Sequence, residues 1–220
     1  MLDILQNIDV ATILMRVIPI MVCITVHEVA HGYTAFKLGD DTAKSMGRLT
    51  LNPIKHIDPI GALMMLLIGF GWAKAVPVNM ANFKHPRRDM ALTALAGPLS
   101  NVIFAAIILF ALGILTPYLH EMNNDVGHYT WNIMYITARI SIMLAVFNMI
   151  PLPPLDGSKI LFALLPDNAY ETLMRVERYG FIVLIIIINN NTFRTALMDG
   201  IDTLYSVLSP IFTFAFRLIS

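Results

Sequence analysis

The chain has 220 residues, of which 57% are hydrophobic and 14% charged, and its mean hydropathy is +0.69. A soluble domain carries about 45–50% apolar and about 25% charged residues, so this composition excludes an ordinary soluble protein and indicates several membrane spans. The formal net charge is zero, and no patch combines basic with aromatic residues, which argues against a nucleic-acid partner.

The first apolar run covers residues 11–38 and is long enough to cross a bilayer, since a spanning helix needs about 20 residues. Two stretches after it have the composition of short strands. They are "GRLTLNP" (47–53), which alternates in polarity, and "AKAVPVNMANF" (73–83), where Pro77 is tolerated at a sheet edge. Residues 60–72 are apolar but short, which favours a re-entrant segment between these strands.

The second half of the chain contains further apolar segments. Two are full spans, residues 90–117 and 129–150, joined by a polar loop at 118–128; then come a polar helix at 166–178, a short apolar stretch at 179–189 and a final amphipathic or spanning helix at 196–218. We therefore expect an all-α polytopic membrane protein with about five to six transmembrane helices and a small membrane-associated β element.

The positions of the basic residues predict the orientation of these spans. Lys and Arg follow the first full span, precede the second and follow the third, whereas the N-terminal tail and the 118–128 loop contain none. By the positive-inside rule the N-terminus lies outside, and the ends of the first and third full spans meet at the cytoplasmic side. The first charged residues, Asp3 and Asp9, are acidic, which argues against a cleavable signal peptide.

Two histidines and a glutamate lie inside the first apolar run, in "HEVAH". Residues four apart share one face of a helix, so His27 and His31 can present both imidazoles to one tetrahedral zinc ion. Glu28 can then reach a water at the metal and accept its proton. Ionisable side chains are costly inside a membrane and mark functional sites there, so the pattern favours a hydrolytic zinc site over two structural histidines.

A catalytic zinc takes three protein ligands and keeps one position open, so a third ligand is expected elsewhere. Asp156 follows an apolar span in "NMIPLPPLDG", where prolines break the helix and Gly157 permits a close approach of the backbone. The alternative is that Asp156 only caps the segment that follows it.

The remaining histidines and the cysteine are interpreted as residues without a role in metal binding. The histidines of the polar connectors are taken as solvated loop residues: His56, His85, His120 and His128. Cys23 lies on the same helix face as His27, but we interpret it as a packing residue because a fourth protein ligand would close the site. As the only cysteine, it cannot form a disulfide within the chain.

"HEVAH", then "AGPLSN", then "NMIPLPPLDG", in this order, resemble the site-2 protease family of intramembrane zinc metalloproteases over about residues 10 to 165. The resemblance implies one metalloprotease domain over residues 1–220, zinc held by His27, His31 and Asp156, and Glu28 as the catalytic base. It also implies regulated intramembrane proteolysis of transmembrane substrates within the lipid bilayer. Many relatives carry a PDZ or a cystathionine-synthase-type domain, and this chain resembles the minimal branch without either.

Two amides in apolar spans are candidate substrate-binding residues. The resemblance suggests that Asn148 contacts the substrate backbone near the zinc. Asn101 could donate to the carbonyl oxygen that becomes an oxyanion. For both residues the alternative is a hydrogen bond between membrane helices.

Two other functions remain open for this sequence, a metal-binding membrane transporter and a non-catalytic scaffold that binds membrane segments. A transporter has no need for Glu28, and the intact set of catalytic residues argues against a scaffold. We expect a multi-pass protein of the bacterial cytoplasmic membrane, with its active site toward the cytoplasm.

Overall fold

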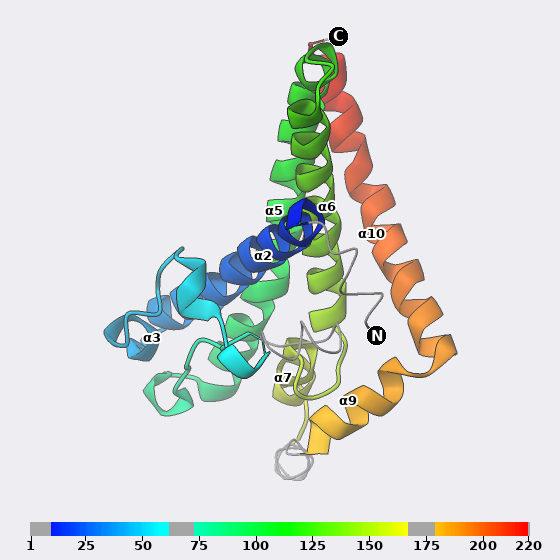
Figure 1. Ribbon diagram of the computed structural model, residues 1–220. Helices are drawn as coiled ribbons and strands as arrows, with labels where there is room; N and C mark the ends of the chain where they lie inside the picture. Colours follow the sequence, from blue (N-terminus) through cyan, green and yellow to red (C-terminus); the bar gives the residue numbers. More distant parts are fainter. Residues whose placement is uncertain (1–9, 62–72, 167–178, 220) are drawn as a thin grey trace.

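Four long helices dominate the computed structural model, which describes residues 10–61, 73–166 and 179–219 (Figure 1). They are α2 (Val10–Lys37), α5 (Pro86–Glu121), α6 (Asp125–Asn148) and α10 (Asn191–Arg217). Shorter elements connect them: α3 (Thr42–Ser45), η1 (Pro53–His56), η2 (Met80–Asn82), α7 (Asp156–Ala163) and α9 (Gly180–Ile188). The predicted re-entrant segment and the polar helix at 166–178 lie almost entirely outside the described residues.

Helices α5 and α6 form an antiparallel hairpin with a very short turn. The side chain of Asn124 accepts the N–H of Gly127 at 3.0 Å and caps α6, and Asn123 takes a positive φ of 41°. The predicted polar loop at 118–128 is therefore wrong in extent, because helix occupies all of it except residues 122–124. Polar composition indicated a loop there, whereas local capping lets both helices continue beyond the apolar residues.

Small side chains bring α5, α6 and α10 into close contact. Their shared core contains Ala105 and Leu109 of α5, Ala138 and Ile142 of α6, and Ile201 and Leu208 of α10. At Gly113 an added Cβ would lie 2.5 Å from the backbone oxygen of Phe212, so α5 and α10 touch backbone to backbone. Such contacts are typical of helices packed within a bilayer.

Three helices among the described residues are long and apolar enough to cross a membrane, namely residues 17–37, α5 and α6. A fourth span exists if α9 and α10, which are bent by 87° at their junction, count as one. The expected five to six spans are thus not found in the described part of the chain. Helix α9 is too short to cross alone, since a spanning helix needs about 20 residues.

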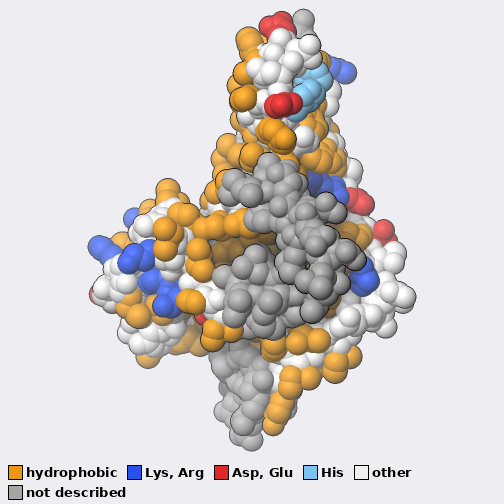
Figure 2. All heavy atoms as spheres, in the orientation of Figure 1, with side chains coloured by type: hydrophobic (Ala, Val, Ile, Leu, Met, Phe, Trp, Pro, Cys, Tyr) orange, Lys and Arg blue, Asp and Glu red, His pale blue; other side chains and the backbone are white. Residues whose placement is uncertain are grey.

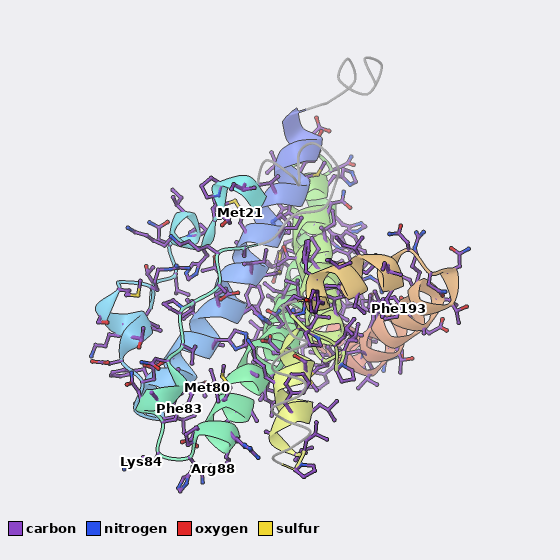
Figure 3. All side chains as sticks on the ribbon, turned by 90° about the horizontal axis from the view of Figure 1, so that it is seen from below. Met21, Met80, Phe83, Lys84, Arg88 and Phe193 are labelled. Carbon is purple, nitrogen blue, oxygen red and sulfur yellow. The ribbon has the colours of Figure 1, made fainter. Side chains whose placement is uncertain are left out.

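The expected β element is reduced to one isolated bridge between Ile57 and Ala73 in the part of the chain that is described. Residues 73–79 are extended but pair with no second strand there. Side chains of α2 and of the segment after it bind this backbone instead, and Pro77 lacks the N–H that a ladder would use. In Figure 3, the chain that leads to Met80 and Phe83 runs beside α2.

One end of the molecule is basic. Figure 2 shows Lys and Arg side chains over the lobe that contains α3 and the start of α5, while the tip of the α5–α6 hairpin carries acidic and histidine side chains. The C-terminal end of α2 and the N-terminal end of α5 lie in this basic lobe, and α7 lies at the lower end of the bundle in the same view (Figure 1). The sequence motifs from α2 and from α7 are therefore brought to the same end of the helix bundle.

Candidate metal centre

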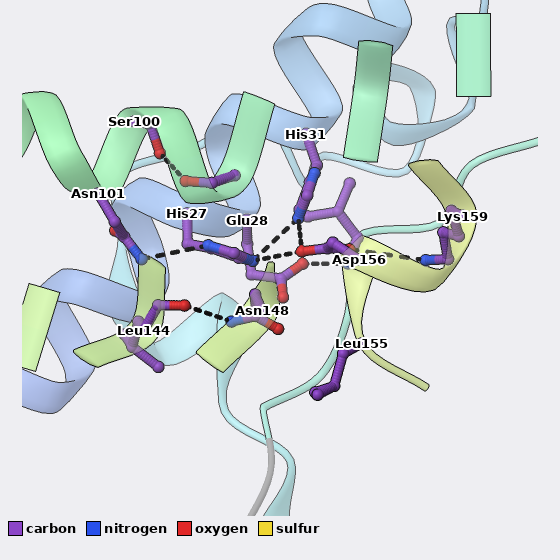
Figure 4. Close-up of polar contacts among 12 residues, drawn as sticks. His27, Glu28, His31, Ser100, Asn101, Leu144, Asn148, Leu155, Asp156 and Lys159 are labelled. Atoms are coloured by element: carbon purple, nitrogen blue, oxygen red, sulfur yellow. Dashed lines mark hydrogen bonds and ion pairs between the residues drawn. The ribbon is translucent and has the colours of Figure 1, made fainter. Parts of the chain in front are cut away.

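Three polar atoms from α2 and α7 converge on one point. The Nε2 atoms of His27 and His31 are 2.9 Å apart, and each lies 3.1 Å from Oδ2 of Asp156 (Figure 4). All three residues are buried, and they form a group whose ligand atoms lie within 4.8 Å of one another. Ligand atoms around a tetrahedral zinc at about 2.1 Å would be roughly 3.4 Å apart, so a small outward shift accommodates the ion.

The hydrogen bonding of His31 shows that this cluster suits a cation. Nδ1 of His31 lies 2.7 Å from the backbone oxygen of Thr93, which can only accept, so Nδ1 carries the proton. In a neutral ring Nε2 then presents a lone pair toward Asp156 and His27. Lone pairs and a carboxylate oxygen at this spacing repel one another, and a bound divalent ion removes the repulsion. The donor set therefore fits zinc.

One face of α5 supports both histidines. Thr93, Gly97 and Asn101 recur every four residues and so lie on the same side of the helix. The amide of Asn101 lies 3.2 Å from Nδ1 of His27. At Gly97, an added Cβ would overlap the ring of His31 and lie 2.6 Å from Cε1 of His27, so only glycine lets α5 approach this closely.

The third ligand residue is held at the start of α7. Asp156 is the first residue of that helix, immediately after the proline-rich break. At Gly157 an added Cβ would overlap the backbone oxygen of Met149 and lie 2.5 Å from that of Ile150, so a larger residue would push α7 off the end of α6. The other carboxylate oxygen of Asp156, Oδ1, lies 3.8 Å from Nζ of Lys159.

Glu28 lies beside the cluster and belongs to none of its contacts. Its Oε2 accepts the backbone N–H of Val76 at 2.7 Å, which ties α2 to the extended segment 73–79. Glu28 is half-buried, whereas the three ligand residues are buried. This carboxylate therefore lies beside the centre and is held by the backbone of segment 73–79.

The two candidate substrate-binding amides occupy different environments. Asn101 is fully buried, with its side chain against His27, and its backbone oxygen accepts the hydroxyl of Ser141 at 2.8 Å. Asn148 ends α6 and is half-buried, and its Nδ2 donates to the backbone oxygen of Leu144 at 3.0 Å. Both amides border the centre in Figure 4.

The other histidines and Cys23 lie outside the metal cluster. His85, His120 and His128 are exposed, as expected, but His120 and His128 lie in α5 and α6 and not in a loop. The expectation for His56 is wrong, because its ring is buried and Nε2 bonds to the backbone oxygen of Thr50 at 2.8 Å. Cys23 is a buried packing residue whose thiol donates to the backbone oxygen of Thr137.

Sequence reasoning missed several neighbours of the centre. Thr93 contributes only its backbone oxygen to the site. Its position eight residues before Asn101 could have indicated it, because the two residues share one helix face. Lys159 lies one helical turn after Asp156, a spacing from which a contact between the two side chains could have been predicted. The contact with Val76 uses a main-chain N–H, and no side-chain pattern indicates such a contact.

The sequence pattern of peptidase family M50 matches residues 15–188 of the chain. The chain belongs to this family, the site-2 protease family. No solved structure matches the chain significantly.

Similar proteins come from several bacteria. A Bacillus subtilis protein named "Putative zinc metalloprotease YwhC" is 42% identical over 200 residues, which covers 89% of this chain and 91% of that protein. A Mycolicibacterium smegmatis protein named "Putative zinc metalloprotease Rip2" is 25% identical over 174 residues, 76% of this chain and 64% of that protein. The Rip2 of Mycobacterium tuberculosis strain H37Rv is 28% identical over 173 residues, which covers 76% of this chain and 63% of that protein. Family and relatives together support a zinc protease.

Proposed function

We propose that the chain is an intramembrane zinc endopeptidase that hydrolyses peptide bonds in or near transmembrane helices of membrane protein substrates. The observation that carries this proposal is the convergence of His27, His31 and Asp156 beside Glu28. All but Asp156 lie on α2, a helix apolar enough to span a membrane. The substrate class follows from this location, because a site on a spanning helix is reached most directly by another membrane segment.

The chain's own residues divide the chemistry between them. His27, His31 and Asp156 would hold the zinc, which when bound supplies Lewis acidity and lowers the pKa of a water toward about 7. Glu28 accepts the proton of the attacking water and returns it to the leaving amine. The burial of the three ligand residues limits competing water and strengthens the electrostatic interactions within the site.

The two amides have separate proposed roles. Asn148 ends α6 and has one amide oxygen available beside the centre, which suits a contact with the substrate backbone. Asn101 could donate to the developing oxyanion, but its proximity to His27 also suits it to orient that ligand. Variants of the two residues separate these roles, since loss of a substrate contact raises KM and loss of a ligand partner weakens zinc binding.

We further propose that the protein resides in the cytoplasmic membrane of a bacterium, with its N-terminus outside and its active site toward the cytoplasm. The basic lobe, where the end of α2 and the start of α5 lie, supports this orientation. Single cysteines introduced beside His27 and Asp156, in a Cys23→Ala background, should react with a water-soluble thiol reagent from the cytoplasmic side. Reaction only from the opposite side would contradict the orientation.

The decisive experiment measures zinc content and cleavage together. Purified wild-type protein should bind one zinc ion per chain and cleave members of a panel of transmembrane helices. Asp156→Ala should lose both zinc and cleavage, and Glu28→Gln should keep zinc and lose cleavage. A Glu28→Gln protein that still moves zinc across a membrane would indicate a transporter. A wild-type protein that binds transmembrane peptides and cleaves none would indicate a scaffold.

A further inference from the structure

The extended segment 73–79 contacts the proposed base directly. Oε2 of Glu28 accepts the N–H of Val76 at 2.7 Å. The side chain of Val76 is buried, and an added Cβ at Gly32, one turn after Glu28, would lie 2.9 Å from its Cγ1. Because Pro77 follows, Val76 is restricted to extended backbone. The N–H that meets Glu28 is therefore fixed by the packing and backbone of this segment.

A buried carboxylate holds the downstream end of the segment. Asp40 is fully buried, and its oxygens accept the N–H of Asn79 at 2.7 Å and Nδ2 of Asn82 at 2.7 Å. The backbone and hydroxyl of Thr42 also donate to it. Asp40 thus joins the chain just after α2 to the chain just after Val76.

A buried guanidinium holds the upstream end. Nη2 of Arg48 donates to the backbone oxygen of Lys74 at 2.7 Å and lies 3.4 Å from that of Ala75. The N–H of Lys74 also donates to the backbone oxygen of His56 at 2.9 Å. Arg48 is 7% exposed, so its charge has left water in order to make these contacts.

These two charges are unusual because neither forms an ion pair within the described part of the chain. Burial of a charge is costly and is tolerated where hydrogen bonds compensate for the lost water. Here three of the compensating contacts involve the backbone of residues 74–79, on either side of Val76, and the others come from Thr42 and Asn82. The two buried charges therefore act as fixed anchors for the amide between them.

We propose that Asp40 and Arg48 are positioning residues for Glu28, and that they act through the N–H of Val76. This proposal rests on the proposed function, in which Glu28 is the base. A glutamate has three rotatable side-chain bonds, and a fixed donor selects one orientation of its carboxylate. A misplacement of about 1 Å can lower the rate about 100-fold, so the anchors bear on kcat although neither touches the substrate.

Hydrogen exchange tests the contact without any substrate. In zinc-loaded wild-type protein in detergent, mass spectrometry at single-amide resolution should find the Val76 amide protected. Glu28→Ala should speed its exchange at least about tenfold and leave the Asn79 amide protected by Asp40. Asp40→Ala and Arg48→Lys should each speed exchange at Val76. The matched control is Asp41→Ala, since Asp41 is exposed and its side chain makes no capping hydrogen bond.

Kinetics and metal content test the consequence. Asp40→Ala and Arg48→Lys should lower kcat about tenfold to 100-fold, with KM and zinc content within about twofold of wild type. Asp40→Asn, which keeps an acceptor oxygen, should recover part of kcat, and Asp41→Ala should equal wild type. A loss that falls on KM instead would overturn the proposal, because the segment would then serve to bind substrate.

Two further outcomes would also overturn it. One is an unprotected Val76 amide in the wild type; the other is an Asp40 or Arg48 variant with fast exchange at Val76 and an unchanged kcat. If Asp40→Ala does not fold, Arg48→Lys gives both the exchange and the kinetic measurement. An amide-to-ester replacement at Val76, which removes the N–H that meets Glu28, gives the kinetic measurement. A wild-type protein that cleaves nothing refutes the proposed function, and the exchange measurements still decide whether the anchors hold Glu28.

Discussion

The amide of Asn101 lies 3.2 Å from Nδ1 of His27, although 74 residues separate them in the chain. Zinc binding through Nε2 requires the proton of His27 on Nδ1, so the amide must turn Oδ1 toward the ring. This relationship makes zinc affinity depend on a residue of α5 that is not a ligand.

Asn101→Ala should therefore weaken zinc binding about 10-fold to 100-fold, because the imidazole loses the partner that fixes its tautomer and orientation. Competition with a chelator measures the affinity directly. Asn101→Asp should retain or raise it, because a carboxylate accepts the same N–H. Ser100→Ala is the control, since its hydroxyl bonds only to the backbone of its own helix at Gly97. Equal affinity in Asn101→Ala and wild type would contradict the prediction.

Gly97→Ala should abolish zinc binding, because its Cβ would overlap the ring of His31 and force α5 away from α2. Metal content of the purified protein checks this. Gly200→Ala is the matched control in another helix, where the nearest atom is a methyl group of Val146 at 3.2 Å that can move slightly. Stoichiometric zinc in Gly97→Ala would show that the two helices can separate without harm to the site.

Arg139 and Asp202 should hold α10 against α6. Nη2 of Arg139 lies 2.9 Å from Oδ1 of Asp202, and the guanidinium also stacks 5.0 Å from the ring of Tyr205. Arg139→Ala or Asp202→Ala should destabilise the protein by about 1–2 kcal/mol, since each leaves a charge without its partner among membrane helices. Unfolding in mixed detergent measures this.

An exchange of the two charges provides the control for that pair. The double variant Arg139→Asp, Asp202→Arg should regain most of the stability that either single alanine variant loses. If the exchanged pair is as unstable as the single variants, the geometry of the contact matters more than its charge, and the ion-pair explanation fails.

The anchor at Asp40 should make stability depend on pH in the acid range. Burial alone would raise the pKa of Asp40, but hydrogen bonds from Thr42, Asn79 and Asn82 lower it below its ordinary value. A carboxyl with a lowered pKa in the folded state adds stability above its ordinary pKa of about 3.9. That stability is lost as the pH falls through the folded value.

The measurement compares the free energy of unfolding of wild type and Asp40→Asn as a function of pH. The difference should be constant from neutral pH down to about pH 4 and should shrink below it. A difference that grows on acidification would contradict the assigned direction of the pKa.

The grouping of His27, His31 and Asp156 could be predicted from the sequence, because the ligand residues of a zinc site have a typical spacing. HEVAH puts two candidate ligand residues on one helix face. A zinc site with two histidines needs a third ligand, and the sequence offers Asp156 for it. The membrane spans were readable for a similar reason, since residues 11–38 and 90–117 coincide closely with α2 and α5. In both cases the regular repeat of the α-helix relates the sequence pattern to the structure.

The remaining features depend on tertiary contacts that leave no period in the sequence. The stretches 47–53 and 73–83 have the composition of short strands, yet Arg48, Glu28 and Asp40 bind the second of them in place of a strand partner. His56 stands in a polar connector and is nevertheless buried, because the chain folds back on it to give a hydrogen bond at Thr50. The local composition describes only the residues adjacent in the chain, whereas these contacts depend on residues that become adjacent when the chain folds.

The separation of the three candidate ligand residues in the chain has a consequence for when the site can assemble. His31 and Asp156 lie 125 residues apart, and α5 and α6 intervene between them. While the ribosome is still making α6, a nascent chain carries two of the three ligand residues and cannot assemble the site. Under the proposed function, proteolytic competence therefore arises late in synthesis, after α6 has been made.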